Sequence, residues 1–479
     1  MSNELLLALA LVLPAAAAGL ISLLGKTPNL REAVSLLTAA VVFLAILSLS
    51  GDVLAGERPA LRLMEIFPGL ALAFEIEPLG LLFALIASGL WFVSGIYSIG
   101  YMRGNDEEHQ TRFFVCFAAA IAAAIGVAFA GNLLTLYLFY EALTFVTYPL
   151  VTHHGDDDAR SGGRTYLSLL LFSSMLFLLP AMAITWWVGG TLDFTPGGIL
   201  GGKVEGGAAA ILLALFAFGI GKAALMPLHR WLPAAMVAPT PVSALLHAVA
   251  VVKAGVFSIV KVVIYVFGLD FATDAFAWLP WVAGFTIVAA SIVALRADNL
   301  KRRLAYSTVS QLSYVVLAAA ILAPLSVAGA VLHIAAHSIS KITLFFAAGA
   351  IYTAAHKTRV SELDGLGRQM PWTFAAFAIG ALSMIGLPPA GGFISKWYMV
   401  SGALQAQHWV ALGVIVLSTL LNAGYFLPIV YRAFFVAGPQ HTHGEAPWTM
   451  VAALVVTAAF TILLFFFAEL PLSLARSLI

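Results

Sequence analysis

Long apolar stretches separated by short polar connections run through the whole chain. A stretch of about 20 apolar residues is long enough to cross the hydrocarbon core of a bilayer as a helix, and the pattern predicts about fourteen of them. The expected helices cover residues 4–24, 33–50, 79–100, 113–130, 132–152, 165–188, 208–226, 241–267, 275–295, 304–322, 326–354, 372–389, 409–433 and 448–472. The chain is therefore expected to be an all-α integral membrane protein, with a single transmembrane domain over residues 1–479.

The composition indicates that lipid is the main solvent of this chain. Hydrophobic residues make up 62% of the sequence and charged residues 10%, and the mean hydropathy is +0.99. A soluble domain contains about 25% charged residues. The net charge of +1, without a long basic run, gives no indication of nucleic-acid binding. The first stretch, which begins at Leu5, is expected to be a retained helix, because Glu4 and no basic residue precede it and a signal peptide needs a basic n-region.

Basic residues are distributed unevenly between the connections. Those after odd-numbered helices contain Lys26, Arg31, Arg103, Arg112, Arg160, Arg164, Arg230, Arg296, Lys301, Arg302, Arg303, Lys357, Arg359, Arg368 and Arg432. Those after even-numbered helices, with the C-terminal segment, contain Arg58, Arg62, Lys203 and Arg476. Because loops rich in Lys and Arg stay in the cytoplasm, both termini are expected on the outer face of the cell inner (cytoplasmic) membrane.

Two of the expected helices are interrupted by proline and glycine. The seventh runs into Pro227 and Pro233, and the twelfth runs into Gly386-Leu-Pro-Pro-Ala-Gly-Gly. Proline removes a backbone donor and clashes with the preceding turn, so neither segment can continue as a straight helix. Interrupted helices at corresponding places in two halves indicate an inverted-repeat transporter with a site near the bilayer midplane. Two inverted five-helix repeats are expected, over residues 110–267 and 275–433.

Ionisable residues lie inside several of these apolar stretches, where each costs about 2.5–3.5 kcal/mol on insertion scales. Such residues usually face the protein interior and serve a function. Three of them are spaced by four residues and therefore share one face of a helix. The full series is Glu141, Lys222, His247, Lys253, His333, His337, Lys341 and Lys396.

We predict that this series forms a proton relay. Histidine titrates near neutral pH, and burial makes a lysine easier to deprotonate. A glutamate that approaches and leaves a lysine changes the proton affinity of that lysine, and the expected pair is Glu141 with Lys222. Neighbouring sites of such a series titrate as coupled units.

Other roles for individual residues remain open. Lys261, two turns beyond Lys253, could extend its ammonium group to the lipid headgroups instead. A lone intramembrane histidine such as His247 can be a structural donor between helices. His333 and His337 could bind a metal, although no carboxylate or thiol is placed nearby to complete the site. One polar cluster is expected to be a solvated cytoplasmic loop: His153, His154, Asp156, Asp157 and Asp158.

No cofactor or metal is expected. Because Cys116 is the only cysteine, the chain cannot form a thiolate iron–sulfur cluster, a cysteine zinc site or an internal disulfide. The sequence also contains no Walker A loop and no dinucleotide fingerprint. Any driving force must come from ion gradients or partner subunits, and the chain has no catalytic chemistry of its own.

Three motifs and the Glu141 helix resemble the antiporter-like subunit family that respiratory complex I, membrane-bound hydrogenases and Mrp cation/proton antiporters share. The motifs are Met226-Pro-Leu-His-Arg-Trp-Leu-Pro-Ala-Ala-Met with Pro239-Thr-Pro-Val-Ser-Ala-Leu-Leu-His247, Leu300-Lys-Arg-Arg-Leu-Ala-Tyr-Ser-Thr-Val-Ser-Gln-Leu, and Gly386-Leu-Pro-Pro-Ala-Gly-Gly-Phe-Ile-Ser-Lys. The resemblance implies fourteen helices in two inverted repeats. It also implies a lateral proton path at mid-membrane, from Glu141 and Lys222 through Lys253 and the histidines to Lys396.

The resemblance implies a proton-translocating subunit of a monovalent cation/proton antiporter complex, with other membrane subunits as partners and Na⁺ or K⁺ as the second ion. The chain length and the Ser-Thr-Val-Ser-Gln-Leu motif favour a D-type Mrp subunit, whereas the segment around His247 resembles the A-type subunit and the largest complex I subunit. Three alternatives remain: a proton-pumping subunit of a redox-driven complex, a non-transporting membrane scaffold, and a solitary transporter of a small solute.

Overall fold

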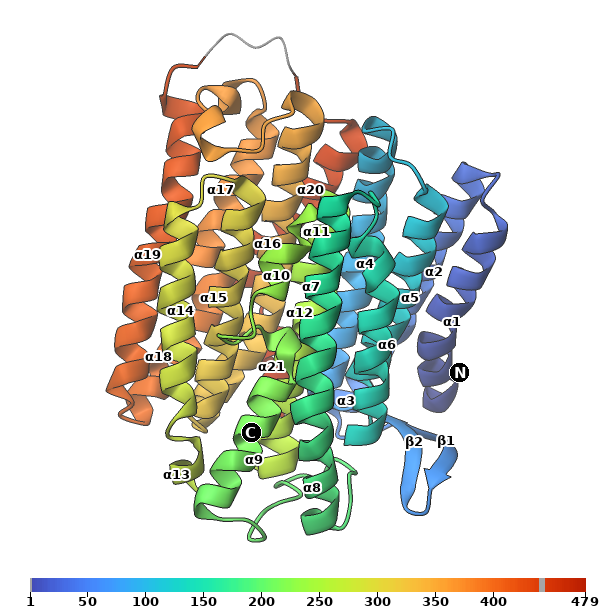
Figure 1. Ribbon diagram of the computed structural model, residues 1–479, viewed down its shortest axis with the longest axis vertical. Coiled ribbons are helices and arrows are strands. Elements are labelled where there is room, and N and C mark those ends of the chain that lie inside the picture. The colour runs from blue at the N-terminus through green and yellow to red at the C-terminus, as the bar shows by residue number, and fades with distance from the viewer. Residues whose placement is uncertain (1, 439–443) are drawn as a thin grey trace.

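The structure, a computed structural model, describes residues 2–438 and 444–479. Within these ranges, eleven helices are long and apolar enough to cross a membrane. They form one bundle with their axes roughly aligned (Figure 1). The spans are Asn3–Leu23, Pro28–Leu54, Pro78–Gly104, Gln110–Ala128, Leu133–Val151, Asp157–Gly189, Thr240–Phe267, Thr273–Arg296, Pro324–Ala355, Trp409–Phe435 and Trp448–Phe466. These helices fit the expected all-α membrane fold, while the number of fourteen remains a prediction.

The helices of the first half begin at polar caps in several cases. The Asn132 side chain accepts from the Thr135 amide at 2.8 Å, and the Asp156 side chain accepts from the Ala159 amide at 2.7 Å. Each bond satisfies an amide that lacks a partner at a helix start. The helices are α1 (Asn3–Leu23), α2 (Pro28–Ser48), α3 (Ser50–Leu54), α4 (Pro78–Gly104), α5 (Gln110–Ala128), α6 (Leu133–Val151), α7 (Asp157–Ser173), the π turn η1 (Ser174–Leu178), α8 (Leu179–Gly189) and α9 (Gly206–Gly219).

The second half differs from the expected boundaries in two places. The stretch expected at 448–472 divides into two helices, and one 15-residue helix beyond the second interruption was not among the expected elements. The helices are α10 (Trp231–Ala234), α11 (Thr240–Ala244), α12 (Val251–Val262), α13 (Thr273–Phe276), α14 (Leu279–Arg296), α15 (Leu300–Ala320), α16 (Pro324–Ala355), α17 (Pro371–Ile385), α18 (Gly391–Gln405), α19 (Trp409–Phe435), α20 (Trp448–Phe466) and α21 (Glu469–Arg476).

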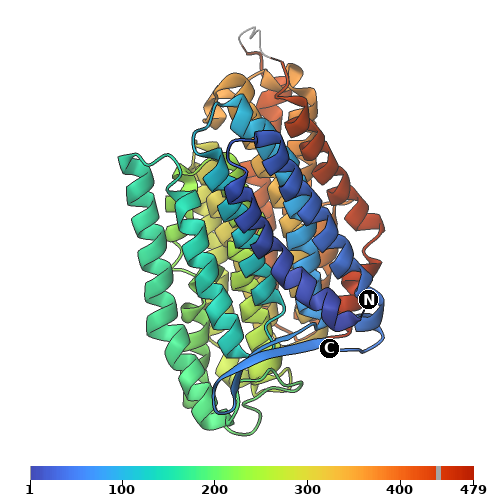
Figure 2. The same cartoon turned by 90° about the vertical axis from the view of Figure 1, so that its right-hand side faces the viewer.

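A β-hairpin occupies part of the connection between residues 51 and 77, so the prediction of an entirely helical chain misses two strands. Strand β1 (Ala60–Phe67) pairs antiparallel with β2 (Leu70–Glu75). Pro68 and Gly69 form the turn, where Pro sets its own φ and Gly69 takes a φ of +78°. The hairpin runs beneath one end of the bundle, the end toward which both termini lie (Figure 2).

Both predicted interruptions are present. Helix α9 ends at Gly219 and is followed by a 3-10 turn, η2 (Gly221–Ala223), after which the chain is irregular up to α10. Helix α17 ends at Ile385, and the chain becomes helical again at Gly391. The expected helix 208–226 is therefore shorter than predicted, because the backbone leaves the helix before the first proline.

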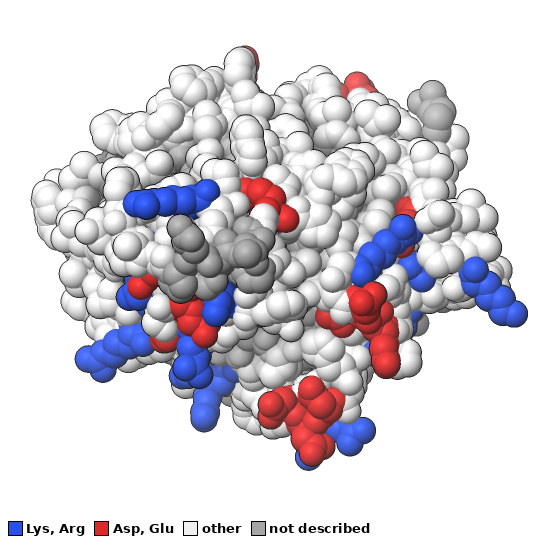
Figure 3. All heavy atoms as spheres, turned by 90° about the horizontal axis from the view of Figure 1, so that it is seen from above, with Lys and Arg blue, Asp and Glu red and all other residues white. Residues whose placement is uncertain are grey.

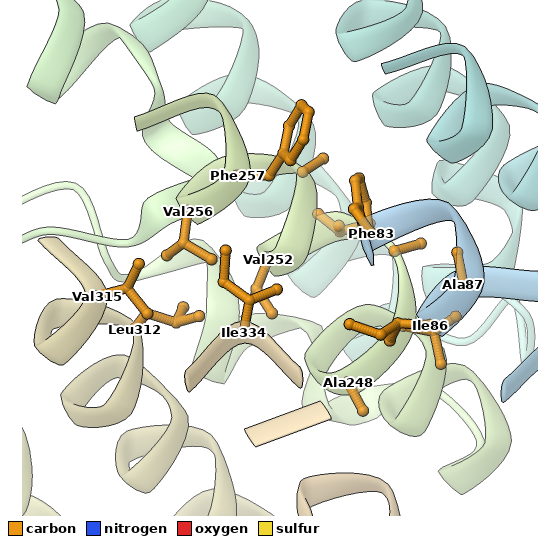
Figure 4. Close-up of a cluster of buried hydrophobic side chains, with 14 of the residues drawn as sticks. Phe83, Ile86, Ala87, Ala248, Val252, Val256, Phe257, Leu312, Val315 and Ile334 are labelled. Carbon is orange, nitrogen blue, oxygen red and sulfur yellow. The ribbon is translucent and has the colours of Figure 1, made fainter. Parts of the chain in front are cut away.

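The segment Thr240–Phe267, which contains α11 and α12, is the centre of the bundle, and 94% of its most apolar stretch is buried. The π turn η4 (Leu245–Val249) lies between α11 and α12, and a second π turn, η5 (Val263–Phe267), ends the segment. Figure 4 shows its apolar side chains Val252, Val256 and Phe257 among residues of α4, α15 and α16. Ionisable groups on this segment are consequently far from solvent unless a pocket reaches them.

Candidate functional site

The predicted central residues meet where α12 packs against α16. Lys253 is buried, and its ammonium nitrogen contacts Nδ1 of His337 on α16. If Lys253 is protonated, Nδ1 accepts this hydrogen bond, and a neutral His337 then carries its own proton on Nε2. That Nε2 is buried without a hydrogen-bond partner among the described residues. His337 can therefore receive a proton on one side of its ring and release one on the other.

His333 lies one turn before His337, with ring centroids 5.9 Å apart. Its Nε2 is 3.0 Å from the Gln311 side-chain oxygen, and its Nδ1 is 2.9 Å from the Ser395 hydroxyl. The Gln311 amide group donates to the Met384 carbonyl at 3.4 Å, which directs its oxygen toward His333. Nε2 of His333 is therefore the nitrogen that donates, in both charge states of the ring.

The Ser395 hydroxyl can satisfy His333 in both charge states. When His333 is neutral, Ser395 donates to Nδ1. When His333 is an imidazolium, Nδ1 donates to Ser395, and the hydroxyl can donate instead to the Gly392 carbonyl, 3.0 Å away. The site therefore leaves no polar group unpaired in either state, which lowers the cost of changing the charge of a buried ring.

Lys341, the third member of the stripe on α16, begins a second chain of contacts. Its ammonium group donates to Ser307 on α15 at 2.8 Å. The Tyr425 hydroxyl lies 3.2 Å from the same Ser307 oxygen and contacts the side-chain oxygen of Asn422. Asn422 in turn donates to the Met384 carbonyl at 3.2 Å.

Lys396 joins both chains of contacts at the Met384 carbonyl. Its ammonium group donates to the carbonyls of Met384 and Ile385, at 3.0 and 2.9 Å. The Lys396 stem lies against Gly386, where an added Cβ would fall 2.5 Å from Cδ of the lysine and where φ is +91°. Only glycine fits this position, so the interruption between α17 and α18 makes room for the lysine.

The expected Glu141–Lys222 pair is not an ion pair in this structure. The Lys222 ammonium group donates to the Tyr140 carbonyl at 2.7 Å and to the Thr144 hydroxyl at 2.6 Å. Both carboxylate oxygens of Glu141 are buried without a hydrogen-bond partner among the described residues. The predicted contact between these two side chains is therefore not formed, and their role as a switch stays a prediction.

The backbone next to Lys222 packs directly on α12. A Cβ at Gly255 would fall 2.3 Å from the Lys222 carbonyl carbon, so only glycine allows this approach. The first interruption thereby brings Lys222 to the helix that carries Lys253. No hydrogen bond between the two lysines is present among the described contacts.

His247 is fully buried and packs on Phe345 with ring centroids 4.7 Å apart. Neither ring nitrogen has a hydrogen-bond partner among the described residues. The structure therefore gives no support to a role for His247 as a structural donor between helices.

Lys261 does not extend to the headgroups. Its ammonium group is buried, 3.2 Å from the Glu77 carboxylate and 2.8 Å from the Ala130 carbonyl that accepts from it. Glu77 also accepts from the Leu79 and Gly80 amides at the start of α4, at 2.7 and 2.9 Å. Because Glu77 lies at the end of an expected polar connection, the hydrophobic pattern did not identify it as a buried residue.

The residues after α6 were expected to form a solvated loop. This prediction is correct for Asp157 and wrong for His153. The Asp157 side chain is fully exposed, but His153 is 3% exposed and packs edge-on against Phe113. Its Nε2 lies 3.8 Å from the Glu107 carboxylate, and His154 lies 3.3 Å from the same oxygen. The helix pattern did not show that the loop between α4 and α5 folds over this position.

Among the described residues, no group of three metal-ligating side chains suitable for a metal ion is present.

Several polar residues that contact the predicted lysines and histidines were not themselves predicted. Two of the missed residues, Ser307 and Gln311, belong to the Leu300 motif, and Tyr140 and Thr144 flank Glu141. Their positions within recognised motifs were the available signal; their partners lie on other helices and could not be read from spacing.

Comparisons with known proteins agree with the fold and the motifs. The family described as NADH:quinone oxidoreductase/Mrp antiporter, TM, matches residues 130–422, and that described as NADH-Ubiquinone oxidoreductase (complex I), chain 5 N-terminus, matches residues 69–114. NADH-quinone oxidoreductase subunit N of Desulforudis audaxviator is 34% identical over 78% of this chain and 75% of its own length. Hydrogenase-4 component B of Escherichia coli is 28% identical over 86% of this chain and 64% of its own length.

The fold is also that of one chain in a solved Mrp complex. A chain in the structure of the Mrp complex from Dietzia sp. superposes with a TM-score of 0.89 at 21% identity, covering 100% of this chain and 97% of that one. Together with the apolar helices, these matches confirm a multi-pass membrane protein of the antiporter-like type. The protein is a member of the transmembrane NADH:quinone oxidoreductase/Mrp antiporter family.

Proposed function

We propose that this chain is a proton-translocating subunit of a multi-subunit monovalent cation/proton antiporter, and that protons move along the buried lysine and histidine series. The observation that carries the proposal is the buried network that begins at the Lys253–His337 contact and ends at Lys396. Four buried lysines without an ion-pair partner among the described residues are costly in a membrane: Lys222, Lys253, Lys341 and Lys396. A transport role accounts for that cost, and a scaffold role does not.

The network contains direct contacts and gaps that water would bridge. Lys253 and His337 are in contact, while His337 and His333 are separated by one helical turn. The Met384 carbonyl can accept hydrogen bonds but has no proton to pass on. It therefore holds its donors in place, and the last transfer to Lys396 needs water beside the carbonyl. Water in other gaps of the network would bind at the unpaired buried nitrogens of His337 and His247.

Glu141 and Lys222 would act as the switch of this path. With Glu141 apart, Lys222 keeps only neutral partners, the Tyr140 carbonyl and the Thr144 hydroxyl. This arrangement favours release of a proton toward Lys253. Approach of the Glu141 carboxylate would favour the protonated lysine again. Movement of α6 against η2 would thus couple an event in a neighbouring subunit to proton release.

The proposal also covers the type of subunit, its membrane and orientation, its partners, the second ion and the two repeats. The chain is a D-type Mrp subunit of the cell inner membrane, with both termini outside and other membrane subunits as partners. Na⁺ or K⁺ crosses the complex in exchange for protons. Residues 110–267 and 275–433 are the two inverted repeats, which is supported by one interrupted helix with a lysine in each.

A redox-driven complex is the second candidate. It is favoured by the 34% identity to a NADH-quinone oxidoreductase subunit. Purification of the complex from the native membrane in mild detergent, followed by mass spectrometry, separates the two. Small hydrophobic subunits without cofactors support the antiporter, and iron–sulfur or nickel-bearing subunits support the redox machine. A chain that purifies alone and still transports contradicts both.

The transport role itself is tested with Lys222→Met and Lys396→Met in the assembled complex. We expect proton transport to fall about a hundredfold or more, the scale of losing a positioned proton donor. Lys203→Met, at an exposed lysine, is the matched control. Normal transport by both buried variants, with normal assembly, would leave the scaffold as the better account.

A further inference from the structure

Glu107, His153 and His154 form a compact titratable cluster that the relay does not include. All three side chains gather at one carboxylate oxygen, Oε2 of Glu107, which lies 3.3 Å from His154 and 3.8 Å from His153. Glu107 comes from the loop between α4 and α5, and the histidines follow α6. The backbone of that loop has positive φ at Asp106 and His109. Such strained conformations persist where the surrounding structure holds them.

Two cavities meet at this cluster. The larger, of about 580 Å³, is lined almost entirely by polar groups, including His109 and His356. The smaller, of about 260 Å³, extends inward past Tyr101 and Lys301 to Thr240. Glu107, His154 and Tyr352 line both cavities. The end of the bundle that carries these loops has side chains of both charges, as seen from above in Figure 3.

The inner cavity leads toward the relay. Thr240 is the first residue of α11, and His247 follows it by seven residues, about 10 Å along a helix axis. Aromatic side chains pack beside this stretch: Phe345 packs on His247, and Phe346 stacks on Tyr97 at 3.9 Å. His247 is not among the residues that line the cavity.

The histidines of the cluster have different surroundings. The hydrogen bond to Glu107 raises the pKa of His154, with a further contribution from Asp156 and an opposing one from Lys301. Burial lowers the pKa of His153 to about 4, with Arg112 and His154 acting in the same direction and Glu107 opposing. His153 is also buried with neither ring nitrogen hydrogen-bonded among the described residues, although it lines the larger cavity. The neutral ring of His153 and the more readily protonated ring of His154 therefore lie beside the same Glu107 carboxylate.

We propose that the Glu107–His153–His154 cluster is the proton-collecting site of this chain, where protons from the aqueous face enter the path to His247. The inference rests on the proposed function. His154 takes a proton from water in the outer cavity and becomes an imidazolium beside Glu107. It then gives the proton to water in the inner cavity and returns to the neutral ring. His153 lies beside the same carboxylate, 3.8 Å away.

The test compares Glu107→Gln and His154→Gln with Asp157→Asn, an exposed carboxylate of the same loop, in the assembled complex. A collecting site matters most when protons are scarce. We therefore expect proton transport about threefold slower or more at about pH 8.5, near-normal transport at about pH 6, and recovery on addition of free imidazole, which titrates near neutral pH. Asp157→Asn should behave as wild type.

Wild-type rates at all pH values for both variants would overturn the inference, as would equal slowing at every pH without recovery by imidazole. Lys222→Met is measured alongside. If Lys222→Met abolishes transport while the cluster variants behave normally, the collecting site is wrong and the relay stands. If Lys222→Met transports normally, the proposed function fails independently of the cluster.

Discussion

The buried Glu77–Lys261 ion pair predicts a specific and asymmetric loss of stability. Glu77→Gln keeps the size of the side chain and removes its charge, so that the Lys261 ammonium group is buried with only neutral acceptors, the Ala130 carbonyl and the amide oxygen of the new glutamine. Removing one partner of a buried pair costs about 3–5 kcal/mol. The cost has an upper limit of about 5 kcal/mol at pH 7, because a lysine can instead release its proton.

The reverse change should cost less. In Lys261→Met, the Glu77 carboxylate keeps its bonds from the Leu79 and Gly80 amides and from the Tyr265 hydroxyl, at 2.7, 2.9 and 3.1 Å. Only one charge-assisted bond is lost, which costs about 1.5–3 kcal/mol. The double variant has no unpaired charge, and we expect it to be at least about 2 kcal/mol more stable than the sum of the single effects.

Unfolding of the purified protein by SDS titration in mixed micelles measures these free energies. Glu75→Gln is the matched control, because Glu75 precedes the same helix and makes no ion pair among the described residues. Additivity of Glu77→Gln and Lys261→Met within about 0.5 kcal/mol would refute the reasoning. A cost below about 1 kcal/mol for Glu77→Gln would refute it as well.

Three further predictions follow from other contacts. Gly255→Ala puts a Cβ 2.3 Å from the carbonyl carbon of Lys222, so we expect about 1–3 kcal/mol of destabilisation and slower transport. Ser395→Ala leaves Nδ1 of His333 without its partner, and the pH profile of transport should shift while Ser395→Thr stays near wild type. Burial lowers the pKa of His153 to about 4, below that of the unfolded chain, so the unfolded state binds the proton more readily and stability falls between about pH 6.5 and about pH 4. Thermal unfolding across this range should show a smaller loss for His153→Asn.

Each of these predictions has an outcome that would contradict it. Gly413→Ala, where no atom lies within 4 Å of the added Cβ, is the control for Gly255→Ala, and equal behaviour of the two would show that the close approach is unimportant. An unchanged pH profile in Ser395→Ala would remove the role of the hydroxyl. Identical pH dependence of His153→Asn and wild type would show that another group causes the acid loss.

Hydrophobic length and proline placement predicted the membrane fold and both interrupted helices. These signals are local: a run of about 20 apolar residues or a proline acts on its own segment. The β-hairpin was missed because its strands, with residues such as Arg62 and Glu65, lie in a connection that was treated as a polar loop. Helix α18 was missed because the stretch from Gly386 to Lys396 was read only as an interruption, with no helix expected before residue 409.

The sequence predicted which ionisable residues lie inside the bundle, but it did not predict which side chains they contact. Charge inside an apolar stretch identified Lys253 and the stripe on α16, because burial of charge is visible in sequence. The contact of Lys253 with His337 depends on packing between helices 84 residues apart in the chain. The same limit explains why the expected Glu141–Lys222 ion pair is not present and why Lys261 pairs with Glu77, since both depend on which helices become neighbours.

The measurement that most directly tests the central claim is proton transport by the assembled complex with Lys253→Met, compared with Lys261→Arg. Lys253→Met removes the titratable group that contacts His337, whereas Lys261→Arg keeps a positive charge beside Glu77 that cannot be released. The account predicts normal assembly of both variants, loss of transport in Lys253→Met and near-normal transport in Lys261→Arg. Transport at the wild-type rate by assembled Lys253→Met would contradict it.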